Sequence, residues 1–218
     1  MIARLLELLY PSKCVFCGSL LSREETDVCD ACRGSLPYVE RQNKHIPFSE
    51  KSVAVFYYEA QVRESVLRYK FLGRMHYSAA YGRLLAMCIL ENELKFDLIA
   101  HVPVSRARRR QRGYDQAELL CRAVARELGV RRAKLLRKIR NNPAQSGISA
   151  PERRRANVLG VYRADDRELM AGKNILLIDD VMTTGATLSE CCRTLLDAGA
   201  ARVSCAALAC ARPRKNSR

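Results

Sequence analysis

The sequence lacks any apolar run near the roughly 20 residues that a membrane-spanning helix needs. Its apolar opening, residues 2–9, is short and is interrupted by Glu7. We therefore interpret this segment as a helix packed on the body of the protein and not as a secretory signal. No internal repeat is present. These absences predict a cytoplasmic protein without a membrane span.

Aromatic and histidine side chains are also scarce. There is no tryptophan, aromatic residues make up 6% of the chain, and only three histidines are present. Neither His76 nor His101 has an acidic partner at an informative spacing, so no residue is predicted as a dedicated general base. His101 lies in an apolar stretch, where we expect a histidine whose hydrogen bonds are satisfied within the core.

The most informative segment that is present is residues 174–187, NILLIDDVMTTGAT. Its aliphatic start is typical of a strand buried on both faces of a parallel sheet. A helical pattern follows at Leu188, Cys192, Leu195 and Leu196. We therefore expect Asp179, Asp180 and the threonines on a strand-to-helix loop at the carboxyl end of a strand, where open α/β sheets bind ligands.

The residue types in this loop predict a phosphorylated sugar as the ligand. Backbone N–H groups of residues 183–187 would point at one phosphate at a helix N-terminus, with threonine hydroxyls as further donors. Gly185 would allow a close backbone approach. Carboxylates would repel that phosphate, so Asp179 and Asp180 are expected to hold sugar hydroxyls and Mg²⁺. The alternative is an ordinary turn rich in aspartate.

This segment resembles the phosphoribosyl-pyrophosphate (PRPP) signature of type I phosphoribosyltransferases. The resemblance implies that Asp179 and Asp180 bind the ribose hydroxyls in a catalytic role. It also implies that the residues after them bind the 5-phosphate. The PRPP-binding residues expected here are Asp179, Asp180, Val181, Met182, Thr183, Thr184, Gly185, Ala186 and Thr187.

Four cysteines near the N-terminus form two Cys-x-x-Cys pairs separated by eleven residues: Cys14, Cys17, Cys29 and Cys32. Such pairs suit one tetrahedral zinc ion with a structural role. A disulfide framework is disfavoured because no secretory signal precedes the cysteines, and redox chemistry would need one pair only. The six other cysteines fall in apolar patterns and are expected to be buried thiols.

Cysteine pairs, a basic centre and a PRPP loop together are similar to the ComF family of competence proteins. Tyr69-Lys70-Phe71 resembles that family's early lysine motif. Residues 102–105, followed by arginines and Tyr114, resemble its second block, with Asp115 where the family usually has asparagine. Lys138, Arg140 and residues 153–158 resemble the third block. The resemblance covers most of the chain and implies that Pro103, Val104, Ser105 and Arg106 form the pyrophosphate loop.

The order of strand and helix patterns predicts an α/β fold. We expect a type I phosphoribosyltransferase-like parallel sheet flanked by helices, with a small N-terminal zinc-binding module. The predicted division is 1–45 for the zinc module, 46–212 for the phosphoribosyltransferase-like domain and 213–218 for a basic tail. Strands are expected at 53–58, 97–104, 174–178 and 201–211. Residues 137–157 are predicted to form a mobile loop or hairpin.

Basic residues exceed acidic ones by 38 to 23, which gives a formal net charge of +15. They are concentrated in a predicted loop at residues 106–112, then at 131–140 and 153–155. One pyrophosphate needs roughly two or three arginines, so the excess favours a nucleic-acid backbone with low sequence specificity. A basic surface without a dedicated partner is the alternative. The residues expected to bind nucleic acid are Arg108, Arg109, Arg110, Arg112, Lys138 and Arg140.

We therefore predict a PRPP-binding protein of the phosphoribosyltransferase type with structural Zn²⁺, and with Mg²⁺ bound together with PRPP. The ComF resemblance implies a role in natural transformation with single-stranded DNA as a partner. Docking to other competence proteins is compatible with that role. The alternative is an active phosphoribosyltransferase of nucleotide metabolism or salvage without a DNA role. The sequence alone does not decide whether the site turns over.

Overall fold

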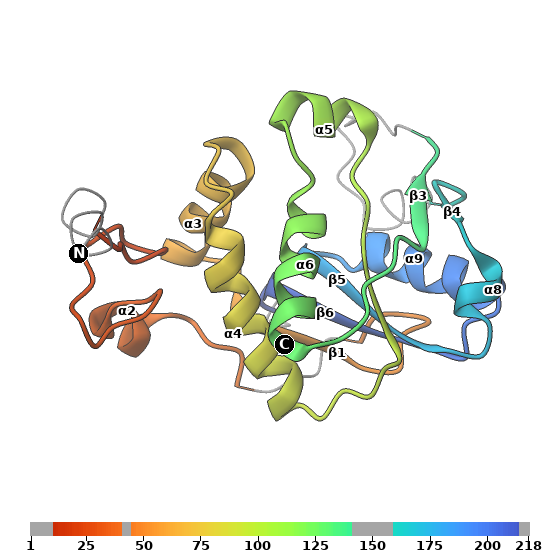
Figure 1. Cartoon of the computed structure of the whole chain (residues 1–218), viewed down its shortest axis with the longest axis horizontal. Helices are drawn as coiled ribbons and strands as arrows, with labels where there is room; N and C mark the ends of the chain where they lie inside the picture. Colours follow the sequence, from red (N-terminus) through yellow and green to blue (C-terminus); the bar gives the residue numbers. More distant parts are fainter. Residues whose placement is uncertain (1–10, 41–44, 141–158, 214–218) are drawn as a thin grey trace, which may run out of the picture.

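The computed structural model describes residues 11–40, 45–140 and 159–213 (Figure 1). The predicted helix at 2–9 and most of the predicted loop at 137–157 lie outside these ranges, as does most of the predicted tail at 213–218. The described elements, in chain order, are α2 (Asp30–Ser35), β1 (Ser52–Tyr57), α3 (Ala60–Phe71), α4 (Tyr77–Glu91), β2 (Leu98–His101), α5 (Arg106–Arg112), α6 (Gln116–Leu128), β3 (Leu136–Lys138), β4 (Tyr162–Ala164), α8 (Arg167–Met170), β5 (Asn174–Met182), α9 (Ala186–Asp197) and β6 (Arg202–Cys210).

The centre of the molecule is a four-stranded sheet in the order β1-β6-β5-β2. All three strand pairings are parallel, as the alternation of strand and helix patterns predicts. Parallel strands end at the same edge, so the segments that follow β2 and β5 leave the sheet side by side. Figure 1 shows the sheet between the helices, with the N-terminal module at one end and β3, β4, α8 and α9 at the other.

The sheet has a hydrophobic core on each face because successive side chains of β5 point in opposite directions. Leu176 and Ile178 join the core formed with α3, α4 and α6. Ile175 and Leu177 join the core formed with α9 and the β3–β4 pair. Strands covered on both faces in this way read as continuous apolar runs, which is the pattern seen in the sequence.

The N-terminal module packs directly on helices α3 and α4. Ser65 of α3 donates a hydrogen bond to the carbonyl of Val15, and Arg68 donates to the carbonyl of Phe16. Arg83 of α4 binds Asp27 through two nitrogen–oxygen contacts of 2.6 Å. Since Phe16 is buried in the same core as α4, the module and the sheet domain share apolar packing.

Two expectations about local structure were wrong. The basic segment 106–112 is the helix α5, capped by the Ser105 hydroxyl and ended by Gly113 in the left-handed conformation (φ 81°). The acid pair belongs to strand β5, which runs on to Met182, instead of the following loop. In both places the polar residues obscured a regular element: arginine is a good helix former, and a strand can extend beyond its apolar run.

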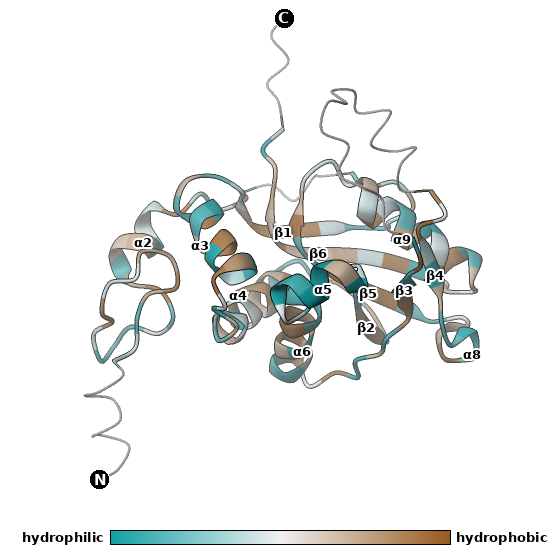
Figure 2. Cartoon of the chain, turned by 90° about the horizontal axis from the view of Figure 1, so that it is seen from above, coloured by the Kyte–Doolittle hydropathy of each residue, from teal (hydrophilic) through white to brown (hydrophobic). Residues whose placement is uncertain are grey.

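The other predicted strands are confirmed within a few residues, with β2 shorter than expected at Leu98–His101. On either side of the predicted loop or hairpin at 137–157, most of which lies outside the described residues, β3 and β4 pair antiparallel from Leu136–Ala164 to Lys138–Tyr162. Among the described residues, no helix is both long and apolar enough to cross a membrane. Figure 2, viewed from above, shows α5 as a largely hydrophilic helix.

Candidate functional site

The two predicted ligand loops meet at one edge of the sheet. Strands β2 and β5 are neighbours, with His101 opposite Ile178, and the Val102 N–H donates to the Ile178 carbonyl at 2.9 Å. The loop 103–106 therefore begins beside the strand that carries the acid pair. The turn 183–187 follows that strand at the same edge. Sequence positions about 80 residues apart are brought together by this pairing.

The two acids point to opposite faces of β5, as neighbours on a strand must. Asp180 faces α3, and its Oδ1 lies 2.6 Å from the Nζ of Lys70. Its Oδ2 is buried and has no hydrogen-bond partner among the described residues. A buried carboxylate oxygen without a partner is costly, so this atom is available to a ligand hydroxyl or cation.

Asp179 is half-buried on the face shared with α9. Its Oδ1 accepts a hydrogen bond of 2.8 Å from the backbone N–H of Asp180. Burial, together with the neighbouring Asp180 carboxylate, raises the pKa of Asp179 to about 8, although Lys70 acts in the opposite direction. The raised pKa favours the protonated form of Asp179, and a cation bound beside it would favour the ionised form.

Lys70 is a site residue that the sequence pointed to only as part of a motif. It is held in place by its neighbour Tyr69, whose hydroxyl donates to the Gln116 carbonyl at 2.7 Å. The hydroxyl of Tyr114 donates in turn to the Tyr69 carbonyl. These bonds join the end of α3 to the start of α6 and direct Lys70 at Asp180, 110 positions away in the sequence.

Arg112 lies near Asp180 at the same edge of the sheet, and the space between the two ligand loops is called the cleft below. Its guanidinium lies over the ring of Phe71, 4.7 Å from the centroid, in a cation–π contact. Its Nε is buried without a hydrogen-bond partner within the described part of the chain. Three consecutive residues therefore contact three parts of the site: Tyr69 contacts Gln116, Lys70 contacts Asp180 and Phe71 contacts Arg112.

The turn after β5 has the form expected of a phosphate cradle. Gly185 has φ 80°, and a Cβ at this position would lie 2.4 Å from the Ile46 Cδ1. Thr183 and Thr184 are exposed, and the Thr184 hydroxyl accepts from the Ala186 N–H at 3.4 Å. Helix α9 begins at Ala186, so its first-turn N–H groups point towards this turn. Gly185 is thus needed for the backbone and for Ile46 as well as for any ligand.

Asp115 supports the opposite loop. One carboxylate oxygen accepts from the Val104 N–H at 2.9 Å, and the other caps α6 by accepting from the Glu118 N–H at 3.1 Å. The side chain is buried. An acid at this position therefore ties the predicted pyrophosphate loop to a helix N-terminus, where negative charge is favoured. We did not assign it a role from the sequence.

The six residues predicted to bind nucleic acid are divided by the structure. Burial and the positive charge of Arg108 both lower the pKa of Lys138, while Asp179 raises it, so Arg108 and Lys138 share the electrostatic environment of the acid pair. Arg112 is also turned inward. Arg109 contacts Glu118 at 3.7 Å, and Arg108, Arg110 and Arg140 are exposed like Arg109.

His101, at the end of β2, is buried as expected, but its Nδ1 has no hydrogen-bond partner among the described residues. The prediction of a satisfied core histidine was therefore only half right. Burial lowers the pKa of His101, which keeps the ring neutral. No feature of its position makes it a general base for the cleft.

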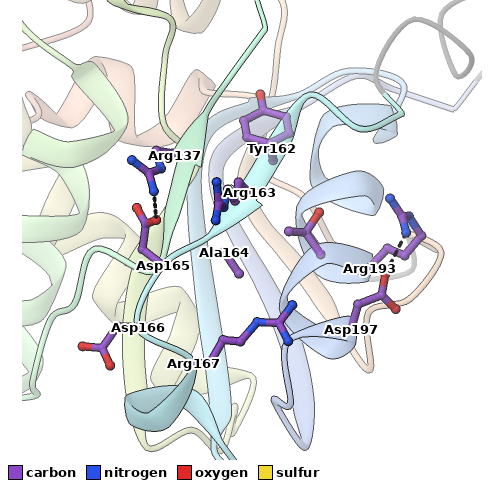
Figure 3. A pocket seen from close by; sticks show the side chains of 10 residues that line it. Arg137, Tyr162, Arg163, Ala164, Asp165, Asp166, Arg167, Arg193 and Asp197 are labelled. Carbon is purple, nitrogen blue, oxygen red and sulfur yellow. Dashed lines mark hydrogen bonds and ion pairs between the residues drawn. The ribbon is translucent and has the colours of Figure 1, made fainter.

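A pocket of about 600 Å³ lies elsewhere, between β4, α8 and the last turns of α9 (Figure 3). Its charged walls are largely self-neutralised: Arg137 pairs with Asp165 at 2.9 Å and Arg193 with Asp197 at 2.7 Å. Neither Asp179 nor Asp180 lines it. The size of this pocket therefore does not identify the acid pair as the candidate site.

The four N-terminal cysteines form a cluster suited to a metal. Their sulfur atoms all lie within 4.8 Å of one another, and those of Cys17 and Cys29 are 3.6 Å apart. Tetrahedral zinc with bonds of about 2.3 Å places its sulfur ligands roughly 3.8 Å apart. The donor set and spacing therefore fit structural zinc. The other six cysteines are all buried and form no disulfide among the described residues, as predicted.

Two parts of the chain match known family models. Residues 5–43 match the model of the double zinc ribbon domain, and residues 115–218 match that of the phosphoribosyl transferase domain. The DNA utilization protein YhgH of Salmonella typhi is 30% identical over 201 residues, covering 87% of this chain and 86% of that protein. The chain belongs to the ComF family.

Other members of the ComF family are similar over much of their length. Competence protein F of Haemophilus influenzae is 25% identical over 210 residues, covering 86% of this chain and 92% of that protein. Competence protein ComFC of Bacillus subtilis is 29% identical over 156 residues, covering 68% of this chain and 59% of that protein. This ComF protein therefore combines a phosphoribosyltransferase-type α/β domain with an N-terminal zinc ribbon.

Proposed function

We propose that this ComF protein binds PRPP in the cleft between the loop 103–106 and the turn 183–187. Asp179 and Asp180 would hold the ribose hydroxyls, and the turn would hold the 5-phosphate. The loop, together with Lys70 and Arg112, would hold the pyrophosphate. These assignments give each charged group of the cleft a partner of opposite sign or a hydroxyl.

One observation carries the proposal: two buried polar atoms in the cleft have no partner among the described residues. Asp180 Oδ2 is an acceptor, and Arg112 Nε is a donor. A structural role alone would leave both atoms unsatisfied, at a cost of about 1–3 kcal/mol each. A ligand with hydroxyls at one end and a pyrophosphate at the other satisfies both kinds of atom.

The donor set also fits Mg²⁺. Carboxylate oxygens of Asp179 and Asp180, with pyrophosphate oxygens and water, are the hard oxygen ligands that this ion prefers. The ion would neutralise charge between the pyrophosphate and the acid pair. Lys70, which pairs with Asp180 at 2.6 Å, would supply positive charge on the same side of the site for the pyrophosphate. The raised pKa of Asp179 implies that binding is accompanied by release of a proton.

We further propose that the protein binds single-stranded DNA in natural transformation. Its relatives carry the names competence protein F, ComFC and DNA utilization protein. Arg106 and Arg110 of α5 are exposed and make no ion pair within the described part of the chain. Such side chains suit a phosphate backbone, which they contact without reading the bases.

The second candidate function is phosphoribosyl transfer. A nitrogen nucleophile would form a bond to the anomeric carbon as the bond from that carbon to the pyrophosphate oxygen breaks, and the pyrophosphate would leave with the electron pair. Lys70 and Arg112 would stabilise the charge of the leaving group. The complete acid pair and hydroxyl-rich turn favour this candidate, and the acceptor would come from nucleotide metabolism or from DNA handling.

The experiment is a titration of PRPP and Mg²⁺ into the protein, followed by both binding and pyrophosphate release, with and without a panel of nitrogenous acceptors. Binding without release under any condition supports a PRPP-responsive DNA-handling protein. Release that depends on an acceptor establishes a transferase. Absence of PRPP binding contradicts the proposed function of the cleft.

A further inference from the structure

A second concentration of positive charge lies around one acid that the PRPP cleft does not use. Glu118 is buried in the first turn of α6, and four cationic side chains contact it. The nitrogen–oxygen distances are 2.9 Å for Lys134, 3.6 Å for Arg132, 3.7 Å for Arg109 and 3.8 Å for Arg122. We call these four side chains the Glu118 patch. Burial alone would raise the pKa of Glu118, but Lys134 and its neighbours lower it, so the acid is charged.

The patch has an excess of charge and free donors. One carboxylate neutralises only one of four cations, and only Lys134 is within hydrogen-bonding distance of it. Three of the four side chains remain about 60% exposed: Arg109 at 58%, Lys134 at 59% and Arg122 at 62%. Their remaining N–H groups face solvent, where they are available to an anionic partner.

The backbone beneath the patch is fixed. Arg109 comes from α5 and Arg122 from α6, while Arg132 and Lys134 lie on the segment after α6. That segment runs parallel to β2: the Ile99 N–H donates to the Arg131 carbonyl at 3.1 Å, and the Ala133 N–H donates to the Ile99 carbonyl at 2.9 Å. The cations are therefore placed by three anchored segments around a shared acid, which reduces the ordering that binding requires.

The composition of the surface identifies the class of partner. None of the large exposed apolar side chains in the described ranges comes from α5, α6 or residues 129–134. A protein interface needs an apolar centre, which the Glu118 patch does not have. It has no aromatic side chain on which bases could stack either. Closely spaced cations without these features suit the repeating phosphates of a nucleic acid.

We propose that the Glu118 patch is a binding surface for the phosphate backbone of nucleic acid, separate from the residues that hold PRPP. The proposal rests on the single-stranded DNA part of the proposed function and gives it a location. It adds Arg122, which lies outside the basic segments seen in the sequence, and it selects Arg132 and Lys134 from the basic segment 131–140. It also removes Arg112 and Lys138, which are partly buried, from the predicted nucleic-acid surface and assigns them to the cleft, while Arg108 is exposed and stays on that surface.

The test is fluorescence polarisation of a labelled 20-nucleotide single strand at several salt concentrations. The variant Arg122→Ser/Lys134→Ser removes two exposed cations and leaves Arg109 and Arg132 beside the buried Glu118; thermal unfolding checks that the variant is folded. We expect about 10-fold weaker binding and a slope of log affinity against log salt that is smaller by about 1.4. PRPP binding by this variant should equal that of the parent.

The matched control is Arg163→Ser/Arg167→Ser. It removes the same charge from the pocket of Figure 3, where these two arginines make no ion pair with described residues. We expect it to change the slope much less. Equal losses in the two variants would mean that only net charge matters and would overturn the proposal. So would a parent that binds polyglutamate as tightly as the oligonucleotide. A parent that binds no oligonucleotide would overturn both the patch and the DNA part of the proposed function, and leave PRPP binding untouched.

Discussion

The PRPP cleft and the Glu118 patch are built from the same residue types but differ in the number of acids and in how far the charges are buried. In the cleft, Asp179 and Asp180 are met by Lys70, Arg112 and Lys138, and some of the polar atoms are buried without a partner. In the patch, one buried acid lies beneath four cations whose outer surfaces mostly face solvent. Burial therefore separates a site for one small ligand from a surface for a long polyanion.

The physical consequence is a difference in salt dependence. Charges shielded from water interact through a lower effective dielectric constant and are screened little by ions. Exposed cations bind a polyanion largely by releasing its counterions, so their affinity falls steeply with salt. If the two sites are distinct in this way, PRPP binding and DNA binding will respond differently to the same changes in the protein or the solution. Four variants or treatments test this, from the largest expected effect to the smallest.

Loss of zinc should have the largest effect. Cys14→Ser with Cys29→Ser removes two ligands, and structural zinc sites supply about 10 kcal/mol or more to folding of their modules. The ribbon packs on α3, which carries Lys70, through the Ser65 and Arg68 hydrogen bonds. We expect a lower melting temperature and weaker PRPP binding, with DNA binding less affected. Metal analysis of the parent should give about one zinc per chain, and a much lower content would contradict this assignment.

Removing one acid from the cleft should abolish most PRPP binding. Asp180→Asn keeps the shape of the side chain but removes the charge that pairs with Lys70. Breaking a buried charged pair costs about 2–5 kcal/mol, so we expect PRPP affinity to fall about 100-fold or more. Calorimetry measures the loss, and oligonucleotide binding serves as the internal control. Unchanged PRPP affinity would show that the site is elsewhere.

Neutralising Lys70 should weaken PRPP binding by about 10- to 100-fold, since one charge-assisted hydrogen bond is worth about 1.5–3 kcal/mol. Lys70→Met preserves the length of the side chain, and Lys70→Arg, which retains the charge, should recover part of the affinity. Both proteins should bind the oligonucleotide like the parent. Equal affinities in all three proteins would leave Lys70 with only a structural role beside Asp180.

The smallest effect concerns pH. The pKa of Asp179 is about 8 in the folded protein, against about 4 in an unfolded chain. The folded state therefore keeps a proton that the unfolded state releases, and this stabilisation is complete below about pH 4 and lost as the pH rises through about 8. The Asp179→Asn variant has no carboxyl group to titrate at this position, so it does not lose this stability as the pH rises. Its free energy of unfolding relative to that of the parent should therefore increase by about 1–3 kcal/mol from pH 5 to pH 9. Thermal unfolding measures this difference, and the same stability difference between variant and parent at pH 5 and pH 9 would show that the pKa is not raised.

Local patterns predicted the fold and the turn at the acid pair well. The apolar run of β5, the helical spacing of α9 and the paired cysteines are each complete within a few residues, so the sequence displays them directly. The boundary of β5 was missed because Asp179 and Asp180 look like loop residues. Yet their backbone continues in register with β6, from Asp179–Ala207 to Met182–Cys210.

The cation assignments could not be predicted, because they depend on contacts between distant segments. Lys70 meets Asp180 only when α3 packs against the start of α6. The arginines of α5 lie within seven residues of sequence, and only the folded helix directs Arg112 inward and Arg109 to Glu118. Glu118 itself is one ordinary acid in a helix pattern, and its cations come from positions between 109 and 134.

The most direct test of the account is competition between the two ligands. A labelled 20-nucleotide strand is bound to the protein at moderate salt, and PRPP with Mg²⁺ is titrated in while both polarisation and heat are recorded. We predict that PRPP binds with the same affinity, within about 2-fold, whether or not the strand is present, and that the strand stays bound. Stoichiometric displacement of the strand by PRPP would contradict the account, because it would mean that one set of cations serves both ligands.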